Sequence, residues 1–313
     1  MYPLYIPWNA MGEIKKKLLT DLGLIVDLTS TSKWNKMMHR PFHYLGAQLF
    51  RHGIYPITKK GKIAHGRTFF GTEMTLQLPS AMDIYLWGAK THDSEIRLAK
   101  FLIHHLKEGD DFMDVGVHFG FFSLLAAKLV GNKGCVTSIE ASPEMFAIFK
   151  KNSIKEPCIT ALNIAAASKE KTIDFFEFPI LYSEYNTLFP EQYNEEKWYQ
   201  KFNARKVSIQ ALPLDKIIEE RHLSPSIIKV DVEGAELEVL QGLEKYLHQG
   251  RPLIVMEYLD KESHRAAVSL TESWGYRPYL IDEAGFLTEI SDLTVLWKKS
   301  NPDSDNIVLK NGH

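Results

Sequence analysis

The chain has 313 residues, of which 45% are hydrophobic and 24% are charged, as in an ordinary globular protein. Its two cysteines exclude a disulfide-rich scaffold, and no apolar run reaches the length of about 18 residues that a membrane-spanning helix needs. Because the N-terminus lacks a signal-peptide pattern, we expect a cytoplasmic protein with one large α/β domain and an additional segment.

The formal net charge of −2 hides an asymmetry along the chain. Residues 1–70 contain 11 Lys and Arg against three acids, an excess of eight positive charges, whereas the remainder has 26 against 36. Such a segment indicates either peripheral contact with an anionic surface, such as the inner face of a membrane, or packing against the acidic body. We expect no nucleic-acid partner, because no nucleic-acid-binding motif is present.

Residues 1–78 predict a basic extension made of helices and a hairpin. Apolar residues recur at helical spacing in 14–22 and 37–49, which a Ser/Thr-rich stretch separates. Residues 68–71 and 74–78 have the alternating residue pattern and the turn that are typical of a β-hairpin. Residues 79–313 form the second predicted domain, which begins with an amphipathic helix over 94–106.

The most informative stretch is residues 114–120, Asp-Val-Gly-Val-His-Phe-Gly, because an apolar strand runs into it and an apolar helix leaves it. Gly116 and Gly120 allow a tight turn, and the start of the helix presents free N–H groups. A second strand, 135–139, ends in Glu140, which is placed to accept hydrogen bonds from the two hydroxyls of a ribose. The stretch predicts a nucleotide-binding site.

The type of nucleotide follows from two residues. A dinucleotide fingerprint has a glycine where the pyrophosphate approaches, and His118 occupies that position. An NAD-dependent oxidoreductase is therefore disfavoured. Glu140 repels phosphate but suits a ligand with an ammonium group and no phosphate, which indicates S-adenosylmethionine as the cofactor.

An irregular segment follows in the middle of the chain. A helix with Ser142 as its N-cap and strands at 159–165 and 172–178 lead into residues 179–206, which have no regular period and contain seven aromatic residues. A connection of this length indicates a lid or substrate-binding loop, with Tyr185 and Asn186 as candidate substrate residues. The alternative is that the rings form a small satellite core.

Residues 226–236 contain a predicted strand in which the apolar Ile228, Val230 and Val232 alternate with Lys229, Asp231 and Glu233. Charges on a buried parallel strand are costly unless they are paired or functional, so we expect these three at the catalytic site. One acid would act as general base, with Lys229 tuning or neutralising its partner. The alternatives are a buried Lys229–Asp231 ion pair, a helix cap made by Glu233, or hydrogen bonds to substrate only.

The last part of the chain continues an alternating βα series. It consists of a helix at 235–247, a strand at 253–256 that ends at Glu257, a helix at 261–274, and strands near 277–281, 294–297 and 307–309. The series predicts a doubly wound, mostly parallel α/β sheet of the Rossmann-like type. No ligand spacing demands a metal, and we expect none. His118 is a second candidate base, although a histidine in such a loop more often positions the main chain.

With these motifs, the chain resembles the FkbM-type methyltransferases, a branch of the class I S-adenosylmethionine-dependent enzymes. The resemblance covers about residues 80–260 and is carried by the segments 114–120, 140–143, 163–168, 229–236 and 252–257. The family usually has alanine where this chain has Val117, which concerns only the fine shape of the loop.

The resemblance implies O-methylation, often of a sugar hydroxyl in a glycolipid, polysaccharide or secondary metabolite. It implies cofactor contacts at the methionine end, the ribose and the adenine from Asp114, Gly116, His118, Gly120, Glu140, Ala141, Asn163 and Ala165. It also implies that Asp231, Glu233 and Glu257 lie beside the transferred methyl group, with Glu257 as a substrate residue. Two alternatives stay open: a methyltransferase for a non-sugar lipid or small metabolite, and a non-catalytic membrane-docking protein that retains the fold.

Overall fold

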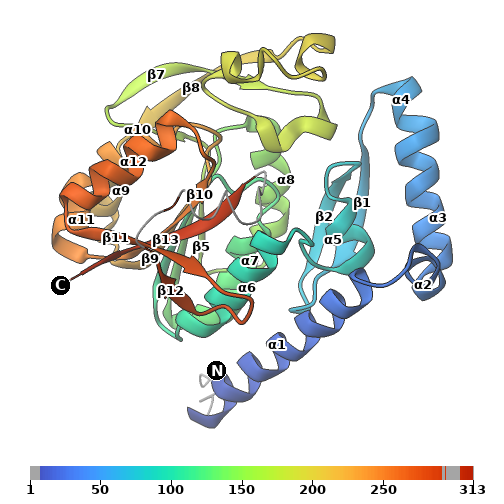
Figure 1. Cartoon of the computed structure of the whole chain (residues 1–313), viewed down its shortest axis with the longest axis horizontal. Coiled ribbons are helices and arrows are strands. Elements are labelled where there is room, and N and C mark those ends of the chain that lie inside the picture. The colour runs from blue at the N-terminus through green and yellow to red at the C-terminus, as the bar shows by residue number, and fades with distance from the viewer. Residues whose placement is uncertain (1–7, 291–292, 294–303, 313) are drawn as a thin grey trace.

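The computed structural model describes residues 8–290, 293 and 304–312 (Figure 1), so the predicted strand at 294–297 lies outside the described residues. Five of the eight strands of the central sheet are parallel: β3 (Asp111–Val115), β4 (Cys135–Ile139), β5 (Ile159–Leu162), β9 (Pro225–Val230) and β10 (Leu253–Tyr258). Numbered along the chain, they follow the order 3-2-1-4-5, as in Rossmann folds. The order reverses between β3 and β9, where such sheets bind ligands.

The rest of the sheet is antiparallel. Strand β13 (Asp305–Asn311) lies between β10 and β11 (Tyr276–Ile281) and runs against both, and β12 (Leu287–Glu289) pairs with the outer edge of β11. The sheet is therefore mixed but doubly wound, which confirms the predicted α/β class.

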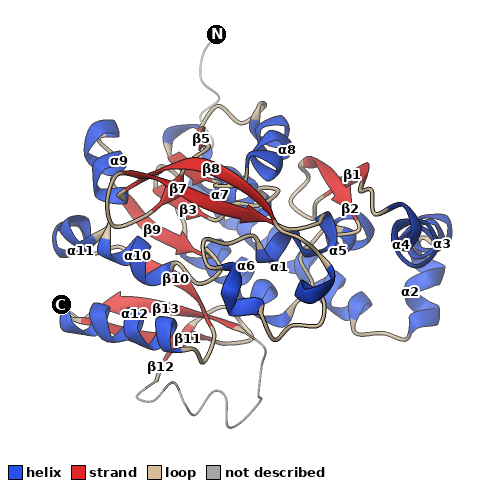
Figure 2. Ribbon diagram, turned by 90° about the horizontal axis from the view of Figure 1, so that it is seen from above, coloured by secondary structure: helices blue, strands red, loops and turns tan. Residues whose placement is uncertain are grey.

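Each face of the sheet has its own hydrophobic core, because neighbouring strand residues point to opposite faces. Phe112 and Ile227 belong to one core, and their neighbours Met113 and Ile228 belong to the other. The first core is covered by α6 (Asp93–His105), α7 (Phe121–Val130) and α8 (Pro143–Ser153). The second is covered by α9 (Leu214–Arg221), α10 (Glu236–Gln241), α11 (Glu244–Gly250) and α12 (Glu262–Ser273), so that helices flank both faces (Figure 2).

Two predicted elements are divided in the structure. The helix expected over 235–247 is α10 followed by α11, because the backbone at Gly242 lies so close to Ala167 that a Cβ there would come within 2.2 Å of its carbonyl oxygen. The strand expected over 159–165 ends at Leu162, and β6 (Ala165–Ala166) joins a different sheet. The amide of Asn163 at this break donates to the carbonyl oxygen of Glu140 at 2.8 Å.

That second sheet contains β6, β7 (Lys171–Glu177) and β8 (Arg205–Leu212), with β8 in the middle. The aromatic segment 179–206 connects β7 to β8 through the short helical turns η3 (Ile180–Tyr185), η4 (Pro190–Tyr193) and η5 (Tyr199–Lys201). Its rings pack on one another: Trp198 stacks on Tyr182 and Tyr185 with centroids 4.5 and 5.2 Å apart. These rings form the satellite cluster that was one of the two expectations for this segment.

The N-terminal part contains α1 (Trp8–Thr29), α2 (Lys33–His39), α3 (Pro41–Leu49), the π-helical turn η1 (Phe50–Ile54), α4 (Tyr55–Thr58), the antiparallel hairpin of β1 (Lys62–Arg67) and β2 (Glu73–Leu78), and α5 (Met82–Trp87). Residues 68–71, which were expected to belong to the hairpin together with 74–78, form its turn. The first strand of the hairpin, β1, therefore lies before them. Leu18 and Leu22 belong to the same core as Phe101. The division of the chain at residue 78 stays a prediction.

Candidate active site

A cavity of about 370 Å³ lies at the carboxyl ends of β3, β4, β9 and β10, beside the point where the strand order reverses. Ten of the fourteen residues predicted for the site line it: Gly116, His118, Glu140, Ala141, Ala165, Tyr185, Asn186, Asp231, Glu233 and Glu257. Asp114, Gly120, Asn163 and Lys229 do not line the cavity but lie behind its wall. The volume is in the range of small-molecule binding sites.

The loop after β3 passes directly over the end of β9. Gly116 has φ +86°, and a Cβ there would lie 1.7 Å from the carbonyl oxygen of Asp231, so only glycine allows this approach. His118 is also left-handed, with φ 53°, and its backbone N–H donates to Glu140 Oε2 at 2.7 Å. The loop is therefore tied both to β9 and to the tip of β4.

His118 has the features of a positioning residue. Its ring Nε2 lies 2.9 Å from the hydroxyl of Ser183, which belongs to the aromatic segment. Burial lowers the pKa of His118 to about 4, so the ring is neutral at physiological pH. The neutral ring, hydrogen-bonded to Ser183, connects the loop after β3 to the aromatic segment.

Glu140 is held in place by main-chain groups and faces the cavity. Besides the N–H of His118, its carboxylate accepts the N–H of Ser142 on Oε1 at 2.8 Å. Burial raises its pKa to about 7. Each oxygen retains a second lone pair, so the carboxylate can still accept a hydroxyl hydrogen. The residues at this end of the cavity therefore fit the ribose of S-adenosylmethionine.

Three of the predicted cofactor residues support the wall from behind. Ser123 Oγ donates to Asp114 Oδ2 at 2.6 Å, and Asp114 itself is almost fully buried. Gly120 starts α7, and Asn163 ties the backbone after β4 in place. Direct contact of Asp114, Gly120 and Asn163 with the cofactor stays a prediction.

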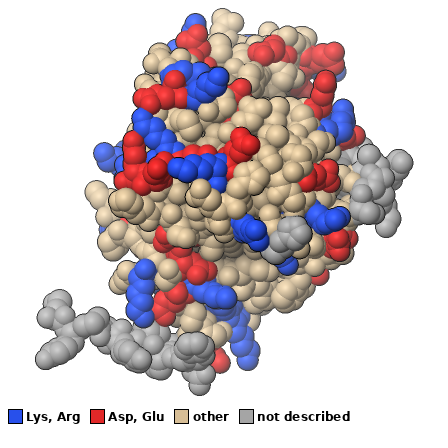
Figure 3. Space-filling model, turned by 90° about the vertical axis from the view of Figure 1, so that its left-hand side faces the viewer, with Lys and Arg blue, Asp and Glu red and all other residues tan. Residues whose placement is uncertain are grey.

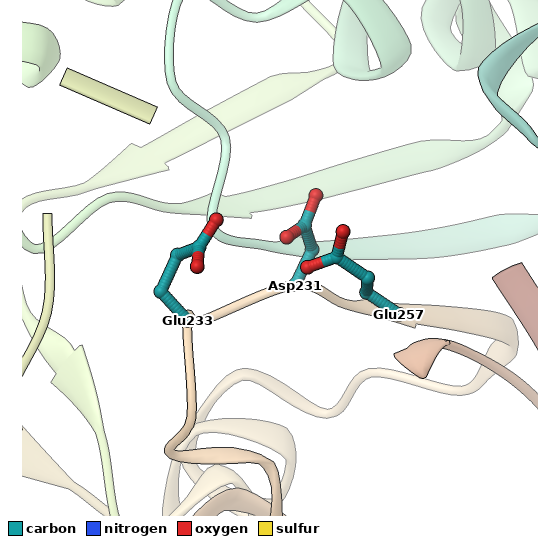
Figure 4. A group of neighbouring side chains, drawn as sticks. All are labelled: Asp231, Glu233 and Glu257. Atoms are coloured by element: carbon teal, nitrogen blue, oxygen red, sulfur yellow. The ribbon is translucent and has the colours of Figure 1, made fainter. Parts of the chain in front are cut away.

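Three carboxyl groups converge at the other end of the cavity. Asp231 and Glu233 follow β9, Glu257 lies in β10, and one oxygen of each lies within 4.8 Å of the others (Figure 4). Burial, together with the charges of Glu257 and Asp231, raises the pKa of Glu233 well above its ordinary value. Burial and the charge of Asp231 raise the pKa of Glu257 to about 8. Three such oxygens are a set that a divalent cation can bind, and the expectation that no metal is needed stays a prediction.

Lys229, which is buried behind the cavity wall, neutralises part of the negative charge of the nearby carboxylates. Its Nζ lies 3.0 Å from Asp231 Oδ2 and 3.6 Å from Asp114 Oδ1. Although burial alone lowers the pKa of Lys229, the carboxylates of Asp231 and Asp114 raise it above its ordinary value. The structure thus contains the Lys229–Asp231 ion pair, which was one of the open alternatives and which is compatible with a base role for Asp231.

The aromatic segment holds Glu233. Tyr193 donates its hydroxyl to Glu233 Oε2 at 2.8 Å, and Thr187 and Gln192 donate to the carbonyl oxygen of Glu233 at 2.7 and 2.8 Å. Glu236, the first residue of α10, accepts on Oε1 the N–H groups of Val232 and Gly234 in the loop before the helix. The N-cap position of α10 is Ala235, and the side chain of Glu233 bonds to the aromatic segment instead of capping the helix.

Sequence reasoning missed a charged cluster at the cavity rim. The Nζ of Lys90 lies 2.9 Å from Glu95 Oε1 and 3.0 Å from Glu184 Oε1, and all three residues line the cavity. Lys90 and Glu184 are 94 positions apart, so no local pattern connects them. Glu95 lies on the polar face of a predicted helix, where a charge is ordinary.

Comparisons with known proteins agree with this geometry. Residues 114–278 match the Methyltransferase FkbM domain. The hexuronic acid methyltransferase AglP of Haloferax volcanii is 25% identical over 172 residues, which are 54% of this chain and 65% of that protein. The methyltransferase sdnD of Sordaria araneosa is 26% identical over 167 residues, 46% of this chain and 64% of that protein. The chain thus spans just under two thirds of the length of each of these relatives.

Among solved structures, an FkbM methyltransferase from Methylobacillus flagellatus is similar with a TM-score of 0.44 and 14% identity, over 74% of this chain and 52% of that one. The family match covers more than half of the chain and includes the glycine loop, Glu140 and the three carboxylates. The chain therefore belongs to the FkbM family of methyltransferases and uses S-adenosylmethionine, as the resemblance implied.

Proposed function

We propose that the chain is an O-methyltransferase that methylates a hydroxyl of a sugar in a glycan, glycolipid or related metabolite, with Asp231 as the general base. The observation that carries the proposal is the position of Asp231. Its side chain is 35% exposed at the cavity, whereas its partner Lys229 is 3% exposed and 3.0 Å away. A carboxylate that an ion pair holds in place and that is open to substrate is positioned to accept a proton.

The three acids have different roles in this proposal. Lys229 forms an ion pair with Asp231, whereas burial raises the pKa values of Glu233 and Glu257 and so favours the protonated form of those two groups. A protonated carboxyl group can donate a hydrogen bond to an acceptor oxygen. Glu233 and Glu257 would orient the acceptor, and Asp231 would take the proton of the reacting hydroxyl. Bound S-adenosylmethionine supplies a methyl group on a sulfonium, which leaves alignment of the hydroxyl as the main task of these residues.

The chemistry of the cavity wall supports a sugar acceptor. Asn186, Tyr185 and Asn306 add further hydrogen-bonding groups, as a polyhydroxyl ligand requires. One relative is named a hexuronic acid methyltransferase, which supports a sugar for this chain. Asp231 would be a carboxylate beside the reacting hydroxyl, and the cation Lys90 is paired with Glu95 and Glu184. We therefore expect an acceptor without phosphate close to its reacting hydroxyl, since like charges repel at short range.

The proposal is tested in two steps. Calorimetric titration with S-adenosylmethionine, with Glu140→Ala as the control variant, establishes the cofactor end of the cavity. A screen of neutral sugars, lipid-linked glycans and non-sugar hydroxyl compounds then follows with methyl-labelled cofactor. Transfer to a sugar hydroxyl is the expected result, and transfer only to a non-sugar lipid or small metabolite would replace the sugar by that acceptor. A folded chain that binds cofactor but methylates none of these compounds would count against the activity.

A further inference from the structure

The N-terminal helices expose an apolar surface, called here the outer face. It consists of side chains from α2, α3 and α4 that are all more than half exposed: Trp34, Met38, Phe42, Leu45, Leu49 and Ile57. Trp34 and Met38 lie one turn apart on α2, and Phe42, Leu45 and Leu49 share one side of α3. Phe42 is 88% exposed and Ile57 is 84% exposed. Isolated apolar residues are common on surfaces, but a contiguous set marks an interaction site.

The outer face is separate from the contacts that hold these helices to the body. Ala47, Phe50 and Tyr55 are buried and belong to the main hydrophobic core. Helix α3 is therefore apolar on two sides, and only one of them packs against the rest of the chain. A helix with apolar residues on its outward side as well is expected where a second apolar medium contacts it.

The chain segment that carries the outer face has charges of one sign. Residues 30–72 contain no Asp or Glu and eight cations: Lys33, Lys36, Arg40, Arg51, Lys59, Lys60, Lys62 and Arg67. Within the described part of the chain, none of these eight forms an ion pair. The side formed by the α9–α12 region instead shows both signs intermingled (Figure 3). These cations therefore belong to the same chain segment as the exposed apolar side chains.

We propose that the outer face docks on an anionic lipid surface, with its apolar side chains among the acyl chains and its cations at the headgroups. A lipid surface offers both an apolar layer and negative charge, and Trp34 suits the boundary between them. A second copy of this chain fits less well, because a two-fold contact would place the same cations against each other. No helix among the described residues is long and apolar enough to cross a membrane, so α2 and α3 would lie along the surface.

The helical segment that carries the outer face also contacts the aromatic segment, through residues outside that face. The hydroxyl of Tyr55 in α4 accepts the N–H of Leu181 at 3.3 Å, and Lys59 Nζ lies 5.6 Å from the ring centroid of Phe202. In Figure 1, α2, α3 and α4 lie at one edge of the molecule, with the hairpin and α5 between them and the central sheet. Docking through this edge would bring the aromatic segment near the lipid surface while leaving the sheet away from it.

Cosedimentation of the full chain with vesicles tests the proposal. We expect binding to phosphatidylglycerol–phosphatidylcholine vesicles and little binding to pure phosphatidylcholine. The variant Phe42→Ser with Leu49→Ser removes two outer-face side chains and should weaken vesicle binding by about a hundredfold, since each would lose its apolar burial in the lipid. The matched control, Ile154→Ser with Phe286→Ser, changes two other exposed apolar residues and should bind as the unmodified chain does.

A second pair of variants tests the charge. Lys59→Glu with Lys60→Glu should weaken binding by more than tenfold and reduce its salt dependence, because each nearby cation contributes about fivefold. Lys150→Glu with Lys151→Glu makes the same change on the exposed side of α8 and should have little effect. Circular dichroism confirms that each variant is folded.

Three results would overturn the proposal. They are absence of binding to anionic vesicles by the folded chain, equal binding by the outer-face variants and their controls, and a concentration-dependent dimer that Phe42→Ser with Leu49→Ser disperses without any vesicle binding. The last result would assign the outer face to a second copy. Methyl transfer is not measured in these assays, so the proposed activity and the docking proposal can fail independently.

Discussion

Replacing Gly116 with alanine would place a methyl group against the carbonyl of Asp231. The new Cβ would lie 1.7 Å from that oxygen, and an ordinary contact needs at least 3.4 Å, so the two segments must separate by about 1.7 Å. The left-handed backbone adds about 1–2 kcal/mol of strain for a residue with a Cβ. Overpacking of this kind adds about 1–3 kcal/mol. We therefore expect Gly116→Ala to lower the free energy of unfolding by about 2–5 kcal/mol.

The same displacement should weaken cofactor binding, because Gly116 and His118 line the cavity. Gly71→Ala is the matched control: Gly71 has φ +90° but no atom within 4 Å of the added Cβ, so it tests backbone strain alone. Urea unfolding and calorimetric titration with S-adenosylmethionine measure both effects. We expect Gly71→Ala to lose only about 1–2 kcal/mol and to keep its affinity. Equal stability and equal affinity of the two variants would refute the proposed contact between the loop and β9.

Three further predictions concern the acids. The pKa of Glu257 is raised from its ordinary value of 4.5 to about 8 in the folded chain. Between these two pH values, the folded chain keeps a proton on Glu257 that the unfolded chain has released. Stability should therefore fall as pH rises from about 4.5 to 8, and Glu257→Gln should flatten this dependence in urea unfolding; an unchanged slope would contradict the assignment. Tyr193→Phe should cost about 1 kcal/mol through loss of the bond to Glu233, whereas Tyr199→Phe, whose hydroxyl has no hydrogen bond in the described structure, should cost little. Turnover should persist in the presence of a chelator; loss of turnover that only added Mg²⁺ restores would assign the three carboxylates to a cation.

Much of the cofactor end of the cavity was predictable because its signals are local. The apolar helix expected after residues 114–120 is α7, and the strand expected over 135–139 agrees with β4 residue for residue. Ser142 caps α8 as expected, by accepting the N–H of Met145. The resemblance to the FkbM-type methyltransferases implied that Asp231, Glu233 and Glu257 lie together, and this agrees with the rule that parallel strands end at one edge of a sheet.

Other features depend on contacts between distant segments and left no local pattern. Gly242 separates α10 from α11 because its backbone meets Ala167, 75 positions earlier, although the apolar period continues through it. The pairing of Lys90 with Glu184 and the bond from Tyr193 to Glu233 likewise join segments that only the folded chain brings together. The charge asymmetry of residues 1–70 was visible in the sequence, but the outward direction of Phe42 and Leu49 was not.

The measurement that tests the proposed mechanism most directly is single-turnover methyl transfer by Asp231→Asn and Glu233→Gln, with the acceptor found in the screen. If Asp231 is the base, its replacement should slow transfer by about 10²–10⁴-fold while the affinity for S-adenosylmethionine is kept, because only the proton acceptor is lost. Glu233→Gln retains a hydrogen-bond donor and should have a much smaller effect. Unchanged transfer in both variants would contradict the base role and leave the Lys229–Asp231 pair as a structural feature of the fold.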